Sequence, residues 1–323
     1  MSKPKVFISR PLHEEGLVEL RKRCEVESHT EDEPLTRREL LAGIADKDAV
    51  MGQFYERIDA EFFDAAPNLK VYSNYAVGNE NIDKDEATRR GIPVCNTPGV
   101  LDEATAEHAW ALVMAAARRV RAAHDYTAGG KWRGWSPFIF TGRQVCGSTL
   151  GVIGAGRIGS TFARMAKGFG MRVLYVSRTA KPELEAELGA EKVDLDTLLA
   201  ESDFVAVHLI LTDETRHMLD TRALGRIKQG AVLVNTSRGA VIDEAALVEE
   251  LKTGRIAAAA LDVFEEEPKI HPGLFELDNV LLSPHIGSNT LRTRIAMAAM
   301  AAENLLAVLE GRKPPACLNP EVL

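Results

Sequence analysis

Three polar segments in the second half of the chain each follow a short apolar run that is typical of a buried strand. Arg238 lies in VNTSRGAVID, Asp262 and Glu265–Glu267 lie in LDVFEEEP, and His285 lies in LLSPHIGSNT. Histidine exchanges a proton near neutral pH, and arginine stays charged and can hold an anion. Taken singly, the arginine could be a cap, the acids a solvated turn and the histidine a residue at a core edge. Because an open α/β sheet binds its ligands at the carboxyl ends of its strands, three such segments in succession indicate one polar site.

A glycine-rich turn precedes these segments, in GVIGAGRIGS at residues 151–160. Gly154 permits a tight turn, Gly156 lets the backbone approach a pyrophosphate, and Gly159 lets a helix pack on a strand. The helix that follows offers unpaired N–H groups to the anion. The pattern predicts dinucleotide binding, with a purely structural turn as the alternative. A flavin-binding fingerprint would be expected near the N-terminus, whereas here a complete α/β unit precedes the turn. A nicotinamide cofactor is therefore favoured over a flavin.

The strand after the glycine turn, VLYVS, ends without the acid that would bind an NAD ribose. Ser177, Arg178 and Thr179 stand there instead. An arginine can pair with a 2′-phosphate, and two hydroxyls can donate to the same group. We therefore expect NADPH/NADP+ to be preferred, with NADH/NAD+ possible; the alternative is a solvated strand end with an incidental arginine.

Strand-like and helix-like runs alternate along most of the sequence, which predicts parallel sheets covered by helices. The first series contains the strands KVFIS, DAVMG and LKVYSNYAVG, and a charged helix around Glu14 to Arg23. GIPVCNTPG carries two prolines and suits a crossover segment. The second series, from Ser148, contains six strand candidates and a helix from Glu244 to Lys252.

Two apolar helices frame the second series. Residues 102–121 read as one long helix, apolar on most of its circumference and thus buried on several sides, followed by the tryptophan-rich loop GGKWRGWSPFIFTGRQVCG. The last helix runs from about Thr290 to Glu310. We therefore predict an α/β protein with two Rossmann-like or flavodoxin-like domains: a discontinuous substrate-binding domain, residues 1–98 plus 289–323, and a dinucleotide-binding Rossmann domain, residues 99–288.

Composition narrows the class of protein. The chain has 323 residues, 46% hydrophobic and 27% charged, and a formal net charge of −8 without a basic block, which disfavours a nucleic-acid partner. Cys24, Cys95, Cys146 and Cys317 lack the spacing of metal ligands, so we expect buried reduced thiols and no metal. No apolar run is long enough to span a membrane and no secretory signal is visible, so we expect no membrane partner and a cytoplasmic location.

The stretches AVGNENID, TAEHAWAL, GVIGAGRIG, NTSRGAVID, LDVFEEEP and SPHIGS resemble the D-2-hydroxyacid dehydrogenase family over nearly the whole chain, and most of all its glyoxylate/hydroxypyruvate reductase branch. The resemblance implies an active site in the cleft between the domains, a homodimer, and catalysis by Arg238, Glu267 and His285. The implied reaction is NAD(P)H-dependent reduction of small 2-keto acids, glyoxylate and hydroxypyruvate, to glycolate and D-glycerate. His285 would protonate the developing alkoxide, Glu267 would favour the charged imidazole, and Arg238 would hold the substrate carboxylate.

The resemblance also implies supporting positions. Backbone N–H groups of Val77 and Gly78 would receive the substrate carboxylate, and Ser288 and the partner subunit's Trp135 would line the substrate pocket. Phe54 is a candidate pocket wall. Cofactor-lining positions besides the glycines and the 177–179 segment are Thr105, Arg157, Ile158, His208, Thr215, Thr236, Asp262 and Gly287. The chain departs from the family pattern at Ile210, where many relatives have proline. The substitution could change the geometry of the loop expected beside the nicotinamide.

Two alternatives remain open within this resemblance. The protein could be a dehydrogenase of the same family for another acid, of the phosphoglycerate or D-lactate type, although no appended regulatory domain is evident. It could also be a nicotinamide-sensing binding protein like the corepressors that share this fold, although both termini are short.

Overall fold

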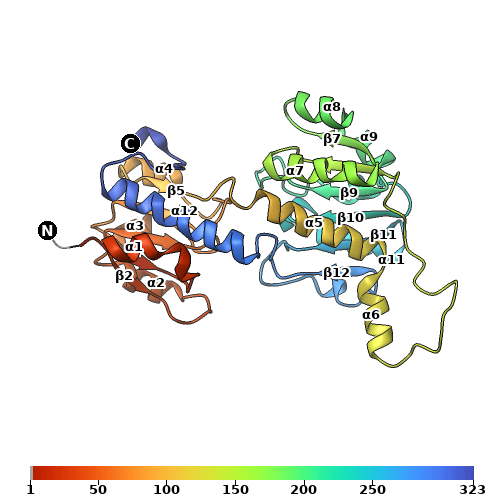
Figure 1. The fold of residues 1–323 in the computed structure, drawn as a ribbon, viewed down its shortest axis with the longest axis horizontal. Coiled ribbons are helices and arrows are strands. Elements are labelled where there is room, and N and C mark those ends of the chain that lie inside the picture. Colours follow the sequence, from red (N-terminus) through yellow and green to blue (C-terminus); the bar gives the residue numbers. More distant parts are fainter. Residues whose placement is uncertain (1–2) are drawn as a thin grey trace. The chain divides into compact units, whose positions relative to one another are not determined.

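The computed structural model describes residues 3–323, and the chain divides into two compact units (Figure 1). The first unit contains the residues up to Leu101 together with Asn289–Leu323, and the second contains Asp102–Ser288. Each unit is built on one parallel sheet, so the predicted α/β class with two parallel sheets is confirmed. The first boundary follows Leu101, whereas the sequence placed it after residue 98.

The first unit holds a five-stranded parallel sheet. Its order, β2-β1-β3-β4-β5, is that of flavodoxin-like folds. The strands are β1 (Lys5–Ile8), β2 (Glu25–Ser28), β3 (Ala49–Gly52), β4 (Val71–Asn74) and β5 (Val94–Cys95). Every residue of β3 and β4 is buried, as expected for strands covered on both faces. The prediction that GIPVCNTPG is only a crossover is wrong, because Val94 and Cys95 pair with Tyr72 and Ser73 of β4.

Helices with polar caps surround this sheet. Thr36 and Glu39 form a reciprocal capping box at the start of α2, and Asp59, Asp83 and Thr290 cap the next helices of the unit through their side chains. The helices are α1 (Val18–Arg23), α2 (Arg37–Ile44), α3 (Ala60–Ala65), α4 (Lys84–Arg89) and α12 (Leu291–Leu309), with 3₁₀ turns η1 (Glu14–Gly16) and η5 (Pro320–Val322). The helix expected around Glu14 to Arg23 thus divides into η1 and α1.

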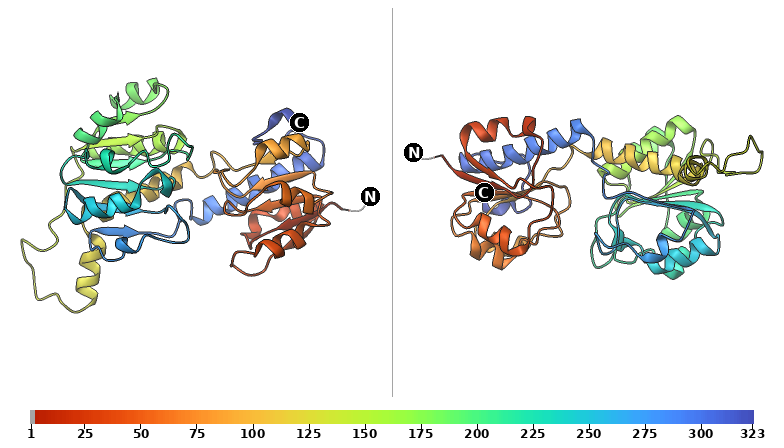
Figure 2. Two further views of the ribbon diagram at one scale, coloured as in Figure 1. Left: turned by 180° about the vertical axis from the view of Figure 1, so that it is seen from behind. Right: turned by 90° about the horizontal axis from the view of Figure 1, so that it is seen from below.

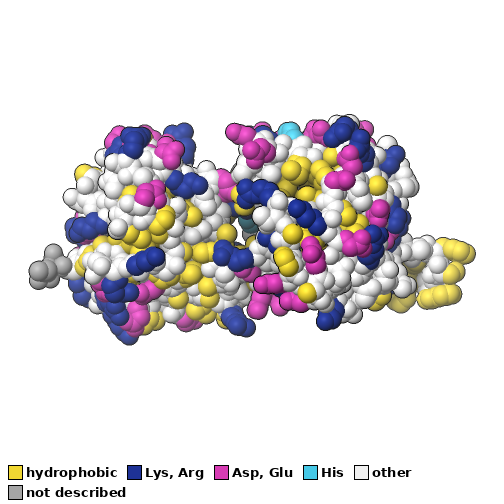
Figure 3. Space-filling model, turned by 90° about the horizontal axis from the view of Figure 1, so that it is seen from above, with side chains coloured by type: hydrophobic (Ala, Val, Ile, Leu, Met, Phe, Trp, Pro, Cys, Tyr) yellow, Lys and Arg dark blue, Asp and Glu magenta, His cyan; other side chains and the backbone are white. Residues whose placement is uncertain are grey.

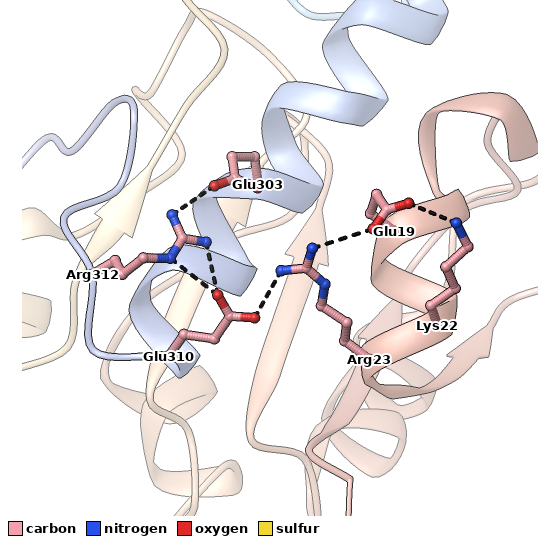
Figure 4. A network of polar contacts seen from close by, with 6 residues as sticks. All are labelled: Glu19, Lys22, Arg23, Glu303, Glu310 and Arg312. Atoms are coloured by element: carbon pink, nitrogen blue, oxygen red, sulfur yellow. Dashed lines mark hydrogen bonds and ion pairs between the residues drawn. The ribbon is translucent and has the colours of Figure 1, made fainter.

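The last helix, α12, returns the chain to the first unit. It packs against β3, β4 and η1, and its inward face is buried. A surface ion-pair network links its end to α1: Arg23 binds Glu310 at 2.9 Å, and Arg312 binds Glu303 at 2.9 Å (Figure 4). Exposed pairs of this kind each contribute about 0–1 kcal/mol, so burial of the apolar face rather than the network holds the helix.

The second unit holds a seven-stranded parallel sheet of order β12-β11-β10-β9-β6-β7-β8. From β6 outward this is the doubly wound order of dinucleotide-binding domains with one further strand at the β12 edge. The strands are β6 (Thr149–Ile153), β7 (Arg172–Val176), β8 (Glu191–Lys192), β9 (Phe204–Val207), β10 (Ala231–Asn235), β11 (Ile256–Leu261) and β12 (Val280–Leu282). The six predicted strands are present, and β8, a charged two-residue edge strand, was missed.

Helices cover both faces of this sheet (Figure 2). On one face, Trp110 of α5 stacks on Phe162 of α7 and on Phe169, with ring centroids 4.8 Å apart in both pairs. On the other face, α9, α10 and α11 pack on a second apolar cluster. The helices are α5 (Asp102–Ala117), α6 (Val120–Ala128), α7 (Arg157–Met165), α8 (Pro182–Leu188), α9 (Leu195–Glu201), α10 (Thr221–Leu224) and α11 (Glu244–Lys252), with 3₁₀ turns η2 (Ala166–Phe169), η3 (Gly239–Val241) and η4 (Pro272–Leu274).

The predicted single helix over 102–121 is wrong at its end, because the chain breaks between α5 and α6. Arg119 adopts a left-handed conformation with φ of 51°. Its guanidinium binds Asp278 at 3.0 Å and lies over the ring of Phe140. The backbone N–H of Arg143 donates to the carbonyl of Ala117, the last residue of α5. These contacts come from distant parts of the chain and end α5 after Ala117.

The loop after α6 exposes large apolar side chains. Trp135 and Phe138 are 85% and 84% exposed, and Trp132 and Ile139 are also exposed. Hydrophobic side chains gather over this loop at the right end of the view in Figure 3. Such a patch is typical of an interaction surface.

All four cysteines are free thiols, and Cys24 and Cys95 are buried as expected. The expectation of burial is wrong for Cys146, which is exposed, and for Cys317, which is half-buried. No helix in residues 3–323 is long and apolar enough to cross a membrane.

Candidate active site

The carboxyl ends of the strands in the second unit gather the predicted polar residues at one edge of the sheet. Because all seven strands are parallel, every strand ends on the same edge. Arg238 follows β10, Asp262 and Glu267 follow β11, and His285 follows β12. Since β10, β11 and β12 are neighbours, the sheet order places these segments side by side, as the sequence predicted.

His285 and Glu267 form a direct pair. His285 Nδ1 lies 2.8 Å from Glu267 Oε2, and the two side chains are 31% and 26% exposed. The other carboxylate oxygen of Glu267 accepts the N–H of Phe264 at 3.0 Å, which fixes the plane of the carboxylate. His285 has a left-handed backbone, with φ of 54°, and its N–H donates to the carbonyl of Asp262 at 2.8 Å. The pair is therefore held from both sides by backbone contacts.

Arg238 lies on a tight turn that contacts the Glu267 segment. Asn235, at the end of β10, accepts from Ser237 and donates to the carbonyl of Arg238 at 2.9 Å. At Gly239 a Cβ atom would overlap the backbone of Phe264, so only glycine allows the two turns to meet this closely. The sequence did not single out Gly239, since the reason for it lies in a segment 25 positions away. Arg238 itself is half-buried.

Asp262 organises the turn that carries His285. Its buried carboxylate accepts from Ser283 Oγ at 2.6 Å and from the N–H groups of Ile286 and Gly287 at 2.9 and 2.8 Å. His108 of α5 lies 3.2 Å from the same carboxylate. Burial alone would raise the pKa of Asp262, but these hydrogen bonds, led by that from His108, outweigh it and hold the pKa below its usual value.

Two residues of this region were not identified as site residues from the sequence. One is His108, in the TAEHAWAL stretch. The other is Glu244, the first residue of α11, whose buried carboxylate accepts the N–H groups of Glu265 at 2.8 Å and His271 at 3.2 Å. Burial raises the pKa of Glu244. By binding both ends of the 265–271 segment, Glu244 holds the loop that carries Glu267.

The glycine turn after β6 has the geometry of a pyrophosphate site. Gly154 has φ of 98°, and a Cβ at Gly159 would overlap the carbonyl of Gly154. Gly156 is the N-cap of α7, and a Cβ there would meet no protein atom within 4 Å. The first and third glycines are thus required by the protein itself, whereas the space at the second is left open for a ligand.

Buried polar atoms without a partner also lie just after β9 and β10, the two strands that follow β6 toward β12 in the sheet order. In residues 3–323, Thr236 Oγ1 and both ring nitrogens of His208 are buried without a hydrogen bond. Burial lowers the pKa of His208 to about 4, so the ring is neutral at physiological pH. Buried polar groups are nearly always hydrogen-bonded, so these atoms fit a site that a polar ligand completes.

The other predicted cofactor positions lie around the same edge. Thr105 is buried and in van der Waals range of Gly287, since a Cβ at Gly287 would lie 3.3 Å from the Thr105 methyl group. Arg157 is exposed, with Nε 3.5 Å from Asp102, and Ile158 is half-buried on α7.

Thr215 closes the loop that carries Ile210. Its hydroxyl donates to the carbonyl of Ile210 at 2.7 Å and accepts the N–H of Thr212 at 2.8 Å. The loop therefore keeps a defined turn with isoleucine in place of the common proline.

The segment after β7 carries Ser177, Arg178 and Thr179. Arg178 is exposed and has no ion-pair or hydrogen-bond partner in residues 3–323, whereas Arg172, the first residue of β7, binds Glu191 and Glu201. The guanidinium is therefore available to an anion from solvent.

In the first unit, Val77 and Gly78 follow β4 and are half-buried, as is Phe54 after β3. Ser288, the last residue of the second unit, is also half-buried. No group of three or more histidine, cysteine, aspartate or glutamate side chains in the described part of the chain is arranged to hold a metal.

Comparison with known proteins agrees with this geometry. Residues 110–287 match the family model for the D-isomer specific 2-hydroxyacid dehydrogenase, NAD binding domain. A glyoxylate reductase of Thermococcus onnurineus is 51% identical over 99% of this chain and 97% of its own length. The chain belongs to the D-2-hydroxyacid dehydrogenase family and is an oxidoreductase of that family.

Solved structures share the whole architecture. The TT0316 protein of Thermus thermophilus superposes with a TM-score of 0.93 at 44% identity, covering 97% of this chain and 99% of that one. The NADPH-dependent glyoxylate/hydroxypyruvate reductase of Sinorhizobium meliloti, solved with NADP and malonate, gives a TM-score of 0.85 at 29% identity, covering 99% and 98%. The predicted family and fold are thus confirmed, and a nicotinamide cofactor is supported.

Proposed function

We propose that this protein reduces glyoxylate and hydroxypyruvate to glycolate and D-glycerate with a nicotinamide cofactor. The observation that carries the proposal is the His285–Glu267 pair at 2.8 Å, next to the Arg238 turn and on the same sheet edge as the glycine turn. This arrangement combines a proton donor, an anion-binding cation and a dinucleotide site. Reductases of 2-keto acids need all three.

The residues have separate roles in this proposal. The bound nicotinamide supplies the hydride that reaches the carbonyl carbon. Because Glu267 holds Nδ1 of His285, the other ring nitrogen is the one that delivers a proton to the carbonyl oxygen. Arg238 binds the substrate carboxylate and polarises the keto oxygen, and the backbone N–H groups of Val77 and Gly78 donate to the same carboxylate.

We propose that NADPH is preferred and that NADH is tolerated. Arg178 is exposed and unpaired in the described residues, and the segment of Ser177, Arg178 and Thr179 contains no acid that would repel a 2′-phosphate. The S. meliloti relative, NADPH-dependent by its description, has the same fold.

The remaining cofactor contacts follow the sheet edge. Gly154, Gly156 and Gly159 receive the pyrophosphate with the N-terminus of α7. Thr236 and His208, whose buried polar atoms have no partner in the described residues, follow β10 and β9 at the same sheet edge and are the next proposed contacts. Asp262, already bound by protein donors, acts by shaping the 285–287 turn. Thr105, Arg157, Ile158, Thr215 and Gly287 complete the proposed lining.

We propose a homodimer in which the loop after α6 packs on a second copy. Trp135 and Phe138 are too exposed for an isolated surface, and burial of such side chains stabilises association by about 25 cal/mol per Å². The partner subunit's Trp135 would line the substrate pocket together with Ser288 and Phe54. Light scattering of wild type and Trp135→Ala tests this: a monomeric wild type would contradict it.

Steady-state assays of the purified protein test the proposed reaction. Glyoxylate, hydroxypyruvate, pyruvate and phosphohydroxypyruvate are each compared with NADPH and with NADH. Turnover of the first two, fastest with NADPH, supports the proposal, and preferential turnover of pyruvate or of the phosphorylated acid assigns another substrate of the same family. No turnover of any 2-keto acid would contradict the enzyme function.

A further inference from the structure

The segment Ala76–Gly78 has its three carbonyl groups held in succession by donors from elsewhere in the first unit. The carbonyl of Ala76 accepts the N–H of Thr97 at 3.0 Å, and that of Val77 accepts Asn96 Nδ2 at 2.9 Å. The carbonyl of Gly78 accepts Asn74 Nδ2 at 2.7 Å. The peptide bonds concerned are trans, since the cis bond of the described chain is Glu267–Pro268.

In a trans peptide the N–H points opposite to the carbonyl of the same plane. Anchoring the carbonyls of Ala76 and Val77 therefore turns the N–H groups of Val77 and Gly78 away from Thr97 and Asn96. Neither N–H has an acceptor within residues 3–323. Two donors are thus fixed in direction and left for a ligand.

Asn96 is itself held by the C-terminal helix. Asn304 of α12 is fully buried, and its Nδ2 donates to the carbonyl of Asn96 at 2.9 Å. The oxygen of the Asn304 amide accepts the N–H of Ala316 at 3.1 Å, which fixes which end of the amide donates. Asn304 thus fixes the backbone of Asn96. The Asn96 side chain is itself restrained, because the residue is only 6% exposed and its Nδ2 is bonded to the carbonyl of Val77.

We propose that Asn96, supported by Asn304, is a positioning residue that aims the Gly78 N–H at the substrate carboxylate. The inference rests on the proposed function, because it assumes that the Val77 and Gly78 N–H groups receive that carboxylate. In this proposal α12 also serves substrate binding. Its residue Asn304, more than 200 positions after Asn96, helps to set the direction of the peptide N–H that binds the substrate.

The experiment compares Asn96→Ala with Asn319→Ala. Asn319 is a matched control because it is also a buried asparagine, 2% exposed, whose side chain bonds to the backbone of the first unit: it accepts the N–H of Val94 at 2.8 Å and donates to the carbonyl of Ile92 at 3.0 Å. Within residues 3–323 its side-chain hydrogen bonds go to residues other than 76–78. Both substitutions remove buried hydrogen bonds from a side chain to the backbone of the first unit, so both should lower the melting temperature.

Only Asn96→Ala should weaken binding of the carboxylate. We expect KM for glyoxylate and the inhibition constant of oxalate to rise about tenfold, as for a lost charge-assisted hydrogen bond, with kcat and the KM of the cofactor changed less than about threefold. Asn96→Ser, which keeps a small donor, should have a smaller effect and serves if the alanine variant does not fold. Equal KM changes in the Asn96 and Asn319 variants would overturn the inference.

Calorimetric titration with oxalate separates this result from the proposed function. If the wild type turned over no 2-keto acid, the proposed function would fail, but oxalate affinity would still report on the two N–H donors. If oxalate bound wild type and Asn96→Ala equally, or bound neither, the positioning role would be refuted.

Discussion

Glu56 should make the first unit less stable as the pH rises, and Glu56→Gln should remove this dependence. The side chain is 7% exposed, and burial raises its pKa from 4.5 to about 7, although the N–H of Gln53 donates to the carboxyl at 2.9 Å. The folded state thus binds the proton more tightly than the unfolded state does. The stabilisation that the Glu56 proton contributes is therefore fully present below about pH 4.5 and is lost as the pH rises through about 7.

The magnitude follows from the difference between the two pKa values. A change in pKa from 4.5 to about 7 corresponds to about 3.5 kcal/mol in total, since a shift of one pKa unit is worth about 1.4 kcal/mol. Glutamine is neutral throughout and keeps an oxygen for the Gln53 N–H. The stability of Glu56→Gln relative to wild type should therefore increase by about 2.5 kcal/mol between pH 5 and pH 8.

Urea denaturation at several pH values measures this difference. Glu15→Gln is the control, because Glu15 is exposed and its substitution should shift the curve little at any pH. Parallel stability curves for wild type and Glu56→Gln across pH 5 to 8 would refute the reasoning.

Three further predictions concern the site. Arg178→Ala should raise the KM of NADPH at least about tenfold more than that of NADH. Equal effects on both KM values in steady-state assays would show that Arg178 does not bind the 2′-phosphate. Arg238→Lys should raise the keto-acid KM and lower kcat together, because an ammonium cannot replace a two-pronged guanidinium; an unchanged KM would argue against carboxylate binding. Gly239→Ala should destabilise the protein by about 1–3 kcal/mol in thermal melts and lower kcat, because its Cβ displaces the backbone of Phe264 and thereby Glu267. A fully stable and active Gly239→Ala enzyme would show that the two turns need not touch.

Local patterns in the sequence predicted most of the second unit. The strand–turn–helix at Gly154–Gly159 and helix α11 lie where the sequence placed them, and α12 begins after its cap, Thr290. Apolar periodicity and caps are set by neighbouring residues, so they can be read without knowledge of the rest of the chain. The Arg238, Glu267 and His285 segments also lie on adjacent strand ends, because the sheet order follows from the alternation.

Contacts between distant segments could not be predicted in this way. The left-handed Arg119 depends on Asp278 and Phe140, and β8 pairs with β7 although it is only two charged residues long. The contact of His108 with Asp262 joins residues far apart in sequence. In each case the local residues permit several conformations and a remote partner selects one.

The effect of His285→Ala on turnover tests the central claim most directly. With glyoxylate and NADPH, kcat should fall at least about 10²-fold, while the dissociation constant of NADPH, measured by fluorescence, stays within about twofold of wild type. A kcat close to that of wild type would contradict the claim that His285 is the proton donor.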